Sequence, residues 1–173
     1  MPASFKTMAS PVGTLTLVGD AGALIAILWE GDDPARVPLR RLVEAADDPV
    51  LVETARQLDA YFARRLDRFD LPLDFRGTAF QQQVWAALLT IPFGETRSYA
   101  AIARQIGRPD AYRAVGAANG RNPISIVAPC HRVIGASGAL TGFAGGLAAK
   151  DYLLTLERGD APVLAPRQAS LAF

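Results

Sequence analysis

Short apolar runs separated by turn-forming residues dominate the beginning of the chain. Three of these runs, residues 4–10, 13–19 and 22–30, are typical of β-strands. The sequence GDAG between the second and third runs predicts a tight hairpin. Residues 29–41 are expected to form a loop. The pattern therefore predicts a small β-rich region at this end of the chain.

The apolar spacing then becomes helical. Residues 48–66 carry apolar side chains three or four positions apart, and Asp48 is placed to cap the first turn. Residues 71–75 follow as a short strand or linker. One amphipathic helix is therefore expected after the strands, with an apolar face formed by Leu51, Ala55, Leu58, Phe62 and Leu66.

A second helical region begins after residue 76. Thr78 and Gln81 have the T-x-x-Q spacing of a capping box, and Pro92 ends the helix that they begin. The apolar face of this helix consists of Phe80, Val84, Trp85 and Leu88.

Two further predicted helices outline a helix-turn-helix. Residues 98–107 and 111–120 have helical patterns, with a turn at residues 107–109 and Asp110 as the expected N-cap of the second. A helix that reads bases usually presents long polar side chains. This one fits either close docking against a groove or packing in a core, because its positions include Ala111, Ala114, Gly116, Ala117 and Ala118.

Charge is divided unevenly along the chain. Residues 1–76 carry 9 Lys and Arg against 12 Asp and Glu, a net charge of −3, whereas residues 77–173 carry 9 against 5, a net charge of +4. We place a domain boundary at this change, near Arg76–Gly77. The positive part is consistent with a surface for a polyanion, although a modest surplus is common on protein surfaces. Residues 104–132 contain only one acidic residue, Asp110. The same stretch contains five arginines, namely Arg104, Arg108, Arg113, Arg121 and Arg132.

The chain contains one cysteine and one histidine, and they are neighbours, Cys130 and His131. A lone cysteine forms no internal disulfide, which fits a reducing, cytoplasmic setting, and it excludes a zinc finger or ribbon. A base beside a thiol can make it a nucleophile. Adjacent side chains do not face each other on a helix or strand, so the pair needs a turn or a bridging water. An inert buried thiol is the alternative interpretation.

A base of this kind needs an acid to orient it, and Glu157 is a candidate. Glu157 lies near the end of the last predicted helix, residues 147–158, which follows a glycine-rich loop. A carboxylate is disfavoured at a helix C-terminus by the helix dipole. Helix geometry alone therefore favours a solvated Glu157 beside Lys150.

No part of the sequence predicts a membrane span or a signal peptide. The two longest uncharged runs, residues 77–94 and 133–149, are interrupted by three glutamines and a proline and by five glycines, respectively. The first residues lack the apolar segment of a secretory signal. We expect a cytoplasmic protein.

Residues 122–157 closely resemble the active-site region of the O6-alkylguanine-DNA alkyltransferases. The P-C-H-R-V core, the G-x-L-T-G-[aromatic]-x-G-G-L loop and the final glutamate match in order and spacing. Residues 80–103 and 113–123 resemble the upstream half of the same domain. The resemblance is dense over residues 77–158, whereas residues 1–76 match the family only in outline.

The resemblance implies an α/β (α+β) protein of two domains. Residues 1–76 are expected to form a small RNase H-like domain with a β-sheet and a helix. Residues 77–160 are expected to form a mainly helical winged helix-turn-helix domain that carries the cysteine. Residues 161–173 remain as a C-terminal tail.

The resemblance also implies direct-reversal DNA repair. Such a protein flips O6-alkylguanine, mainly O6-methylguanine, out of double-stranded DNA and transfers the alkyl group irreversibly to Cys130. One thiol then serves one turnover, with no cofactor and no metal, and the protein is expected to be a monomer that can cluster on DNA. Activity on O4-methylthymine and the range of alkyl sizes stay open.

A non-enzymatic protein that binds alkylated DNA lesions is the alternative. In such relatives the cysteine is replaced, commonly by tryptophan, so the presence of Cys130 favours the enzyme. A transcriptional regulator is disfavoured by the small residues of the predicted helix at residues 111–120. A cysteine hydrolase is a further alternative. It would hydrolyse an acyl-enzyme intermediate and would therefore turn over repeatedly.

The family's catalytic roles carry over to five positions. Cys130 is expected to be the nucleophile, His131 to deprotonate it through a water, and Glu157 to orient His131. Asn122 is expected to brace the cysteine loop. Tyr99 is expected to donate a proton to N3 of the base.

The resemblance assigns a base pocket and a DNA-binding helix as well. Carbonyls of Cys130 and Val133 are expected to accept from the exocyclic amine of the base, and the backbone N–H of Ala144 to meet O6. Phe143 lines the pocket where the family more often has tyrosine. Arg113 is expected to fill the base stack, and the helix to dock in the minor groove. The expected DNA-binding residues are Arg113, Ala114, Gly116, Ala117 and Asn119, and Tyr112 is bulkier than the alanine common beside them.

Overall fold

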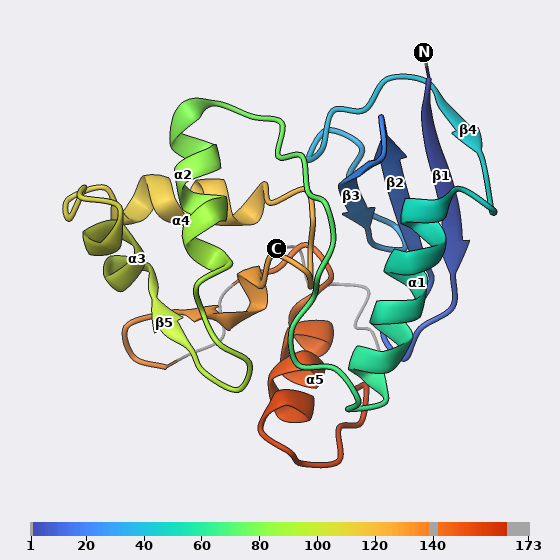
Figure 1. Ribbon diagram of the computed structural model, residues 1–173. Helices are drawn as coiled ribbons and strands as arrows, with labels where there is room; N and C mark the ends of the chain where they lie inside the picture. Colours follow the sequence, from blue (N-terminus) through green and yellow to red (C-terminus); the bar gives the residue numbers. More distant parts are fainter. Residues whose placement is uncertain (1, 139–141, 166–173) are drawn as a thin grey trace. The chain divides into compact units, whose positions relative to one another are not determined.

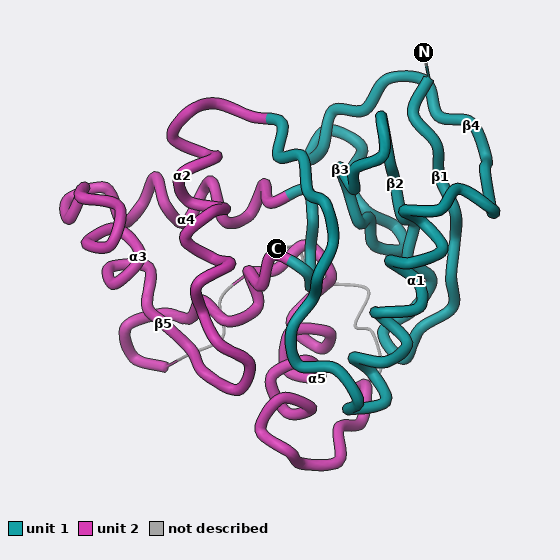
Figure 2. The backbone as a smooth tube through the Cα atoms, viewed as in Figure 1, with its two compact units in different colours: residues 1–76, 123–127 teal, residues 77–122, 128–173 magenta. Residues whose placement is uncertain are grey.

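A computed structural model describes residues 2–138 and 142–165 of the chain (Figure 1). Contacts between residues divide the chain into two compact units (Figure 2). The first unit contains residues 1–76 and 123–127, and the second contains residues 77–122 and 128–173. Residues 123–127 therefore belong to the first unit, although the sequence pattern placed them in the second domain.

The first unit is built on a four-stranded sheet in the order β3-β2-β1-β4. β1 (Ala3–Met8), β2 (Leu15–Asp20) and β3 (Ala23–Leu28) are antiparallel neighbours and confirm the three predicted strands, whereas β4 (Leu42–Glu44) pairs parallel with β1. The predicted hairpin joins β2 to β3 through Ala21 and Gly22, whose φ values are 51° and 81°. Positive φ at both central residues is what the tight hairpin turns require.

Helix α1 (Pro49–Phe62) packs against strands of this sheet (Figure 1). The predicted cap is confirmed, because the Asp48 side chain accepts a hydrogen bond from the backbone N–H of Val50. The helix ends four residues earlier than its apolar pattern predicted. Arg64 has a φ of 60°, and the N–H of Arg65 donates to the carbonyl of Ala60. A left-handed residue after a helix closes its last turn, and glycine is the usual sequence signal for it.

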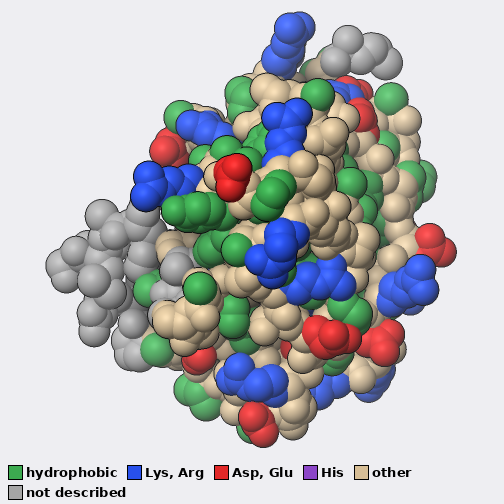
Figure 3. Space-filling model, turned by 90° about the vertical axis from the view of Figure 1, so that its left-hand side faces the viewer, with side chains coloured by type: hydrophobic (Ala, Val, Ile, Leu, Met, Phe, Trp, Pro, Cys, Tyr) green, Lys and Arg blue, Asp and Glu red, His purple; other side chains and the backbone are tan. Residues whose placement is uncertain are grey.

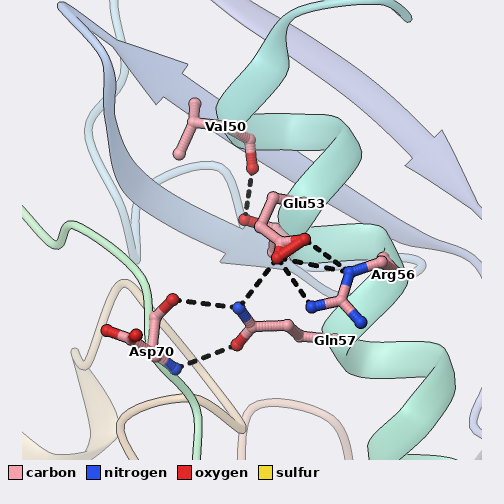
Figure 4. Close-up of polar contacts among 6 residues, drawn as sticks. Val50, Glu53, Arg56, Gln57 and Asp70 are labelled. Atoms are coloured by element: carbon pink, nitrogen blue, oxygen red, sulfur yellow. Dashed lines mark hydrogen bonds and ion pairs between the residues drawn. The ribbon is translucent and has the colours of Figure 1, made fainter.

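The side chain of Gln57 links α1 to the chain at Asp70 (Figure 4). Its amide nitrogen donates to the Asp70 carbonyl at 2.9 Å, and its amide oxygen accepts from the Asp70 N–H at 2.9 Å. Glu53, Arg56 and Gln57 form a further polar cluster along the helix (Figure 4). These contacts lie entirely within the first unit.

Two short segments extend the sheet on the β3 side. Residues 71–75 contribute one bridge, from Leu73 to Leu24, so this stretch is neither a full strand nor a free linker. Ile124 forms a parallel bridge with Ile27, and the N–H of Ile27 donates to the Pro123 carbonyl at 2.8 Å. The segment from 123 to 127 is therefore attached to β3.

The second unit is mainly helical. Its capping box is confirmed, because Gln81 N–H donates to the Thr78 hydroxyl while the Thr78 N–H donates to the Gln81 side chain. The predicted cap at Asp110 is wrong: Ala111 is the N-cap residue of the helix that starts at Tyr112, and no side chain caps that helix. The elements are α2 (Ala79–Leu88), β5 (Arg97–Ser98), α3 (Tyr99–Gln105), α4 (Tyr112–Gly120), the 3-10 helix η1 (Cys130–Arg132), β6 (Val133–Ile134) and α5 (Leu147–Glu157).

The helix-turn-helix pair and α2 share a core. α2 contacts both α3 and α4, and α3 contacts α4. The indole N–H of Trp85 donates to the Ala118 carbonyl at 2.8 Å, which joins α2 to α4. β5 and β6 form a two-stranded parallel sheet, so the strand before α3 is paired with the strand that follows the cysteine. In the described part of the chain, no helix is long and apolar enough to span a membrane.

Candidate active site

The chain approaches Cys130 through a tight turn. The N–H of Cys130 donates to the Ala128 carbonyl at 2.8 Å around Pro129, whose φ and ψ are −82° and 67°. These angles are those of an inverse γ-turn. η1 starts at Cys130, and the residue is only 4% exposed. The turn places the cysteine at the start of a short helix.

Two asparagines fix the backbone around the cysteine. Asn122 is fully buried, and its side-chain nitrogen donates to the Ala128 carbonyl at 2.8 Å. Asn119 is also buried and donates to the Cys130 carbonyl over a longer distance, 3.4 Å. Both contacts lie on the loop that carries the thiol.

His131 and Glu157 form a buried pair. Nε2 of His131 lies 2.7 Å from Oε2 of Glu157, and the two side chains are 0% and 1% exposed. An ionised carboxylate only accepts hydrogen bonds, so Nε2 carries the proton and Nδ1 carries the basic lone pair. Nδ1 is buried and has no hydrogen-bond partner among the residues that the structure describes. The solvated Glu157 that helix geometry favoured is therefore wrong.

Arg132 holds the same carboxylate from its other side. Its Nε lies 2.8 Å from Oε1 of Glu157 and its Nη2 lies 3.1 Å from Oε2. Nη1 donates to the Ile91 carbonyl at 2.6 Å, and the guanidinium lies over the ring of Phe93. The N–H of Gly94 also donates to Oε1 of Glu157, at 3.3 Å. The carboxylate therefore receives hydrogen bonds from three residues.

The charges of this cluster explain its protonation. Burial alone raises the pKa of the Glu157 carboxyl, but the hydrogen bonds from His131 and Arg132 and the positive charge of Arg132 outweigh burial and hold the pKa well below its usual range. Burial lowers the pKa of His131, the positive charges of Arg132 and Lys150 lower it further, and Glu157 opposes them. The result is an ionised glutamate beside a neutral histidine, which is the form that can accept a proton.

Lys150 is a fully buried cation of the same region. Its ammonium donates to the Val133 carbonyl at 2.7 Å, and burial lowers its pKa while the negative charge of an ionised Cys130 opposes that shift. Val133 itself is fully buried. Sequence reasoning assigned no role to Lys150 or to Arg132. A signal existed in the helical spacing, because Lys150 and Glu157 are two turns apart on one face of α5.

Tyr99 lies at the start of α3 and is half-buried. Its ring borders Gly116 of α4: a Cβ on that glycine would lie 3.8 Å from two ring carbons. Phe143 is buried and Ala144 is half-buried. The neighbouring loop positions, residues 139–141, lie outside the described part of the chain.

The expected DNA-binding residues divide into two groups on α4. Arg113, Ala114 and Ala117 are exposed and Gly116 is half-buried. Asn119 requires a correction, because its side chain is buried and donates to the Cys130 carbonyl, so it is not part of the exposed surface.

Tyr112 adds an aromatic ring to the exposed surface of α4. It is 47% exposed, and the Arg113 guanidinium lies 5.8 Å from its ring centroid. Figure 3 shows Lys and Arg side chains interspersed with hydrophobic and uncharged ones on one face of the molecule. Among the described residues, no group of three or more His, Cys, Asp and Glu side chains could hold a metal ion.

Comparison with protein families matches both parts of the chain. Residues 79–159 match the DNA-binding domain of 6-O-methylguanine DNA methyltransferase, and residues 4–75 match its ribonuclease-like domain. A methylated-DNA–protein-cysteine methyltransferase of Mycobacterium tuberculosis is 52% identical over 160 residues, covering 91% of this chain and 94% of the relative. A protein of the same name from Methanosarcina barkeri is 46% identical over 157 residues, covering 90% and 98%.

Solved structures give the same result. The crystal structure of Mycobacterium tuberculosis OGT in complex with DNA has a TM-score of 0.84 and 52% identity, covering 92% of this chain and 95% of that one. A crystal structure of O6-methylguanine methyltransferase from the same organism has a TM-score of 0.80, with the same coverage. Two domain matches, relatives above 50% identity over nearly the whole length and the shared fold agree. The chain belongs to the 6-O-methylguanine DNA methyltransferase family.

Proposed function

We propose that this protein repairs O6-alkylguanine in double-stranded DNA by transferring the alkyl group to its own Cys130. One observation carries the proposal: His131, which directly follows the only cysteine of the chain, is neutral and is held by an ionised, buried Glu157. This is the arrangement of a thiol with a general base and an orienting acid. The family membership supplies the class of reaction.

The transfer is a single displacement. Nδ1 of His131 accepts the thiol proton through a water molecule, and the resulting thiolate attacks the alkyl carbon. The bond between that carbon and O6 breaks, and its electron pair returns to the base. The phenol of Tyr99 donates a proton to N3, so that neutral guanine leaves. The product thioether has no leaving route, so each molecule reacts once.

Other residues of the site hold the reacting groups in place. Asn122 keeps the loop before the cysteine closed through its bond to Ala128. The Val133 carbonyl accepts one hydrogen bond from Lys150 and has a second lone pair for the exocyclic amine of guanine. The backbone N–H of Ala144 is proposed to meet O6, and Phe143 to line the pocket. The Asn119 bond supports the Cys130 carbonyl, the other proposed acceptor.

DNA is proposed to bind along the exposed face of α4. Its small residues allow close approach to the minor groove, and arginines contribute contacts to the backbone phosphates, which suits repair at any sequence. Arg113 is proposed to fill the stack when the lesion is flipped out. We propose that the protein acts as a monomer. In this proposal, residues 77–160 bind DNA and carry out the chemistry. Residues 1–76 serve as a scaffold, and residues 161–173 form a tail. A free thiol as acceptor suits the reducing cytoplasm.

The test is a mass measurement on the Cys130 peptide. After incubation with duplex DNA containing O6-methylguanine, we expect one methyl group on Cys130 in each molecule, and no further reaction with fresh DNA. Cys130→Ala is the matched control and should bind the lesion without removing it. Tight binding by the unmutated protein with an unmodified Cys130 would identify a lesion-binding protein instead.

A further inference from the structure

The segment that leads to the cysteine is held by the first unit. The N–H of Ile27 in β3 donates to the Pro123 carbonyl at 2.8 Å, and Ile27 forms a parallel bridge with Ile124. The indole N–H of Trp29 donates to the hydroxyl of Ser125 at 3.1 Å. Trp29 and Ser125 are both buried. The segment is thus tied down at consecutive positions by residues nearly 100 positions earlier in the chain.

The next residue, Ile126, has a backbone conformation that its side chain disfavours. Its φ is 72°, and the N–H of Val127 donates to the Ser125 carbonyl at 2.9 Å across it. A γ-turn with positive central φ is rare and strained, and a β-branched residue with positive φ is an outlier. The local sequence therefore does not select this turn. The surrounding structure must therefore impose the turn at Ile126. The hydrogen bond of Ser125 and the full burial of Ile126 can hold the turn in place.

Little freedom remains between this turn and the thiol. Cys130 follows Ile126 by four residues, and the last step is the inverse γ-turn at Pro129, whose ring fixes φ. Asn122 closes the same stretch through the Ala128 carbonyl. A change of direction at Ile126 would therefore be passed along the chain to the backbone of Cys130.

We infer that Trp29 and Ser125 are positioning residues for Cys130: their hydrogen bond holds the Ile126 turn, and that turn aims the cysteine. The inference rests on the proposed role of Cys130 as alkyl acceptor. The first unit then contributes to the reaction as more than a scaffold. The side chain of Trp29, which directly follows β3, sets the geometry of the nucleophile.

The experiment measures alkyl transfer from free O6-benzylguanine, a substrate that needs no DNA docking. Ser125→Ala removes the acceptor and Trp29→Phe removes the donor while keeping an aromatic ring. We expect each variant to react about fivefold more slowly than the unmutated protein, the rate equivalent of about 1 kcal/mol. The double variant should be no slower than either single variant, because both remove one interaction. Alkylation of the thiol by iodoacetamide gives a second readout.

Gln57→Leu is the matched control. It removes two hydrogen bonds to the Asp70 backbone inside the first unit (Figure 4). The hydrogen bonds that join β3 and Trp29 to residues 123–127 do not involve Gln57. This variant should lose thermal stability and keep the unmutated rate. Unchanged rates in Ser125→Ala and Trp29→Phe, or losses that follow thermal stability equally in all three variants, would overturn the inference. Failure of the unmutated protein to alkylate Cys130 would instead remove the proposed function.

Discussion

Glu157 accepts a hydrogen bond from Nε2 of His131 at 2.7 Å inside the protein, with both side chains almost completely buried. This bond fixes which ring nitrogen carries the proton and leaves Nδ1 as the base. It also provides a negative charge beside the ring at the moment when His131 becomes positive. In the proposed mechanism, one carboxylate therefore provides both orientation and electrostatic support.

Glu157→Gln separates these functions from packing. The amide keeps the size of the side chain and can still accept from Nε2, but it has no charge to stabilise the imidazolium. We expect the rate of methyl transfer to Cys130 to fall about 10- to 100-fold, within the range for a general base that has lost its support. Single-turnover kinetics with methylated duplex DNA measure this rate. DNA affinity is the control, and it should not change; an unchanged transfer rate would show that the charge of Glu157 has no role in the reaction.

Arg132 is expected to set the pH range of the reaction. Its positive charge lowers the pKa of His131, as do burial and Lys150, whereas Glu157 raises it. Replacing Arg132 by methionine removes that charge and leaves the side chain of His131 and the N–H of Gly94 donating to Glu157, so the pKa of His131 should rise. Only neutral His131 accepts a proton. As the pH is lowered, the transfer rate of the variant should therefore begin to fall at a higher pH than that of the unmutated protein.

The pH profile of Arg132→Met distinguishes this effect from a structural one. Loss of packing against Phe93 would lower the rate equally at every pH. A profile that moves to higher pH supports the electrostatic role. A profile of unchanged position and lower height would show that Arg132 only supports the local structure.

Local patterns predicted most elements of the fold because local interactions make them. Short apolar runs bounded by turn-forming residues identified the first three strands, and capping patterns identified Asp48 and Thr78 correctly. β4 was missed because three residues paired with a distant strand carry no periodic pattern. The end of α1 was misplaced because Arg64, and not glycine, adopts the left-handed conformation. Asp110 had the right residue type for a cap but stands one position too early.

The site was predicted less completely, since its energetics depend on long-range contacts. The P-C-H-R motif identified Cys130 and His131, but helix geometry alone placed Glu157 in solvent. The burial of Glu157 depends on two residues from another part of the chain: Arg132 neutralises its charge, and His131 donates a hydrogen bond to it. Buried polar side chains such as Asn119 are equally invisible to a local pattern. Ile124 pairs with Ile27 of β3 across almost 100 residues, which no spacing in the sequence reveals.

Arg113 offers a test of base flipping. If it fills the stack, Arg113→Ala should slow repair of duplex DNA about 10- to 100-fold, because an extrahelical base costs a few kcal/mol. Reaction with free O6-benzylguanine needs no flipping and should keep its rate. The comparison of the two substrates is the measurement.

Arg104→Ala is the matched control for charge. Arg104 is an exposed arginine on α3, so its loss removes the same positive charge from the same unit. It should weaken duplex binding modestly and in a salt-dependent way. Equal losses on both substrates in Arg113→Ala, or equal losses in both variants on duplex DNA, would remove the flipping role.

Acid should destabilise the protein through the buried His131–Glu157 pair that we propose as the base and its orienting acid. The folded-state pKa values of His131 and Glu157 both lie below their unfolded values, so the unfolded chain binds more protons. The stabilisation is therefore complete above the unfolded pKa of histidine, about 6.5, and is lost as pH falls through the folded pKa values. Glutamate adds its part below about pH 4.3, and each unit by which a pKa is lowered is worth about 1.4 kcal/mol.

Urea unfolding at a series of pH values measures this dependence. The variant His131→Gln should lose the pH dependence of stability just below about pH 6.5, and Glu157→Gln should lose the part below about pH 4.3. Parallel curves for all three proteins would place the acid sensitivity elsewhere in the chain.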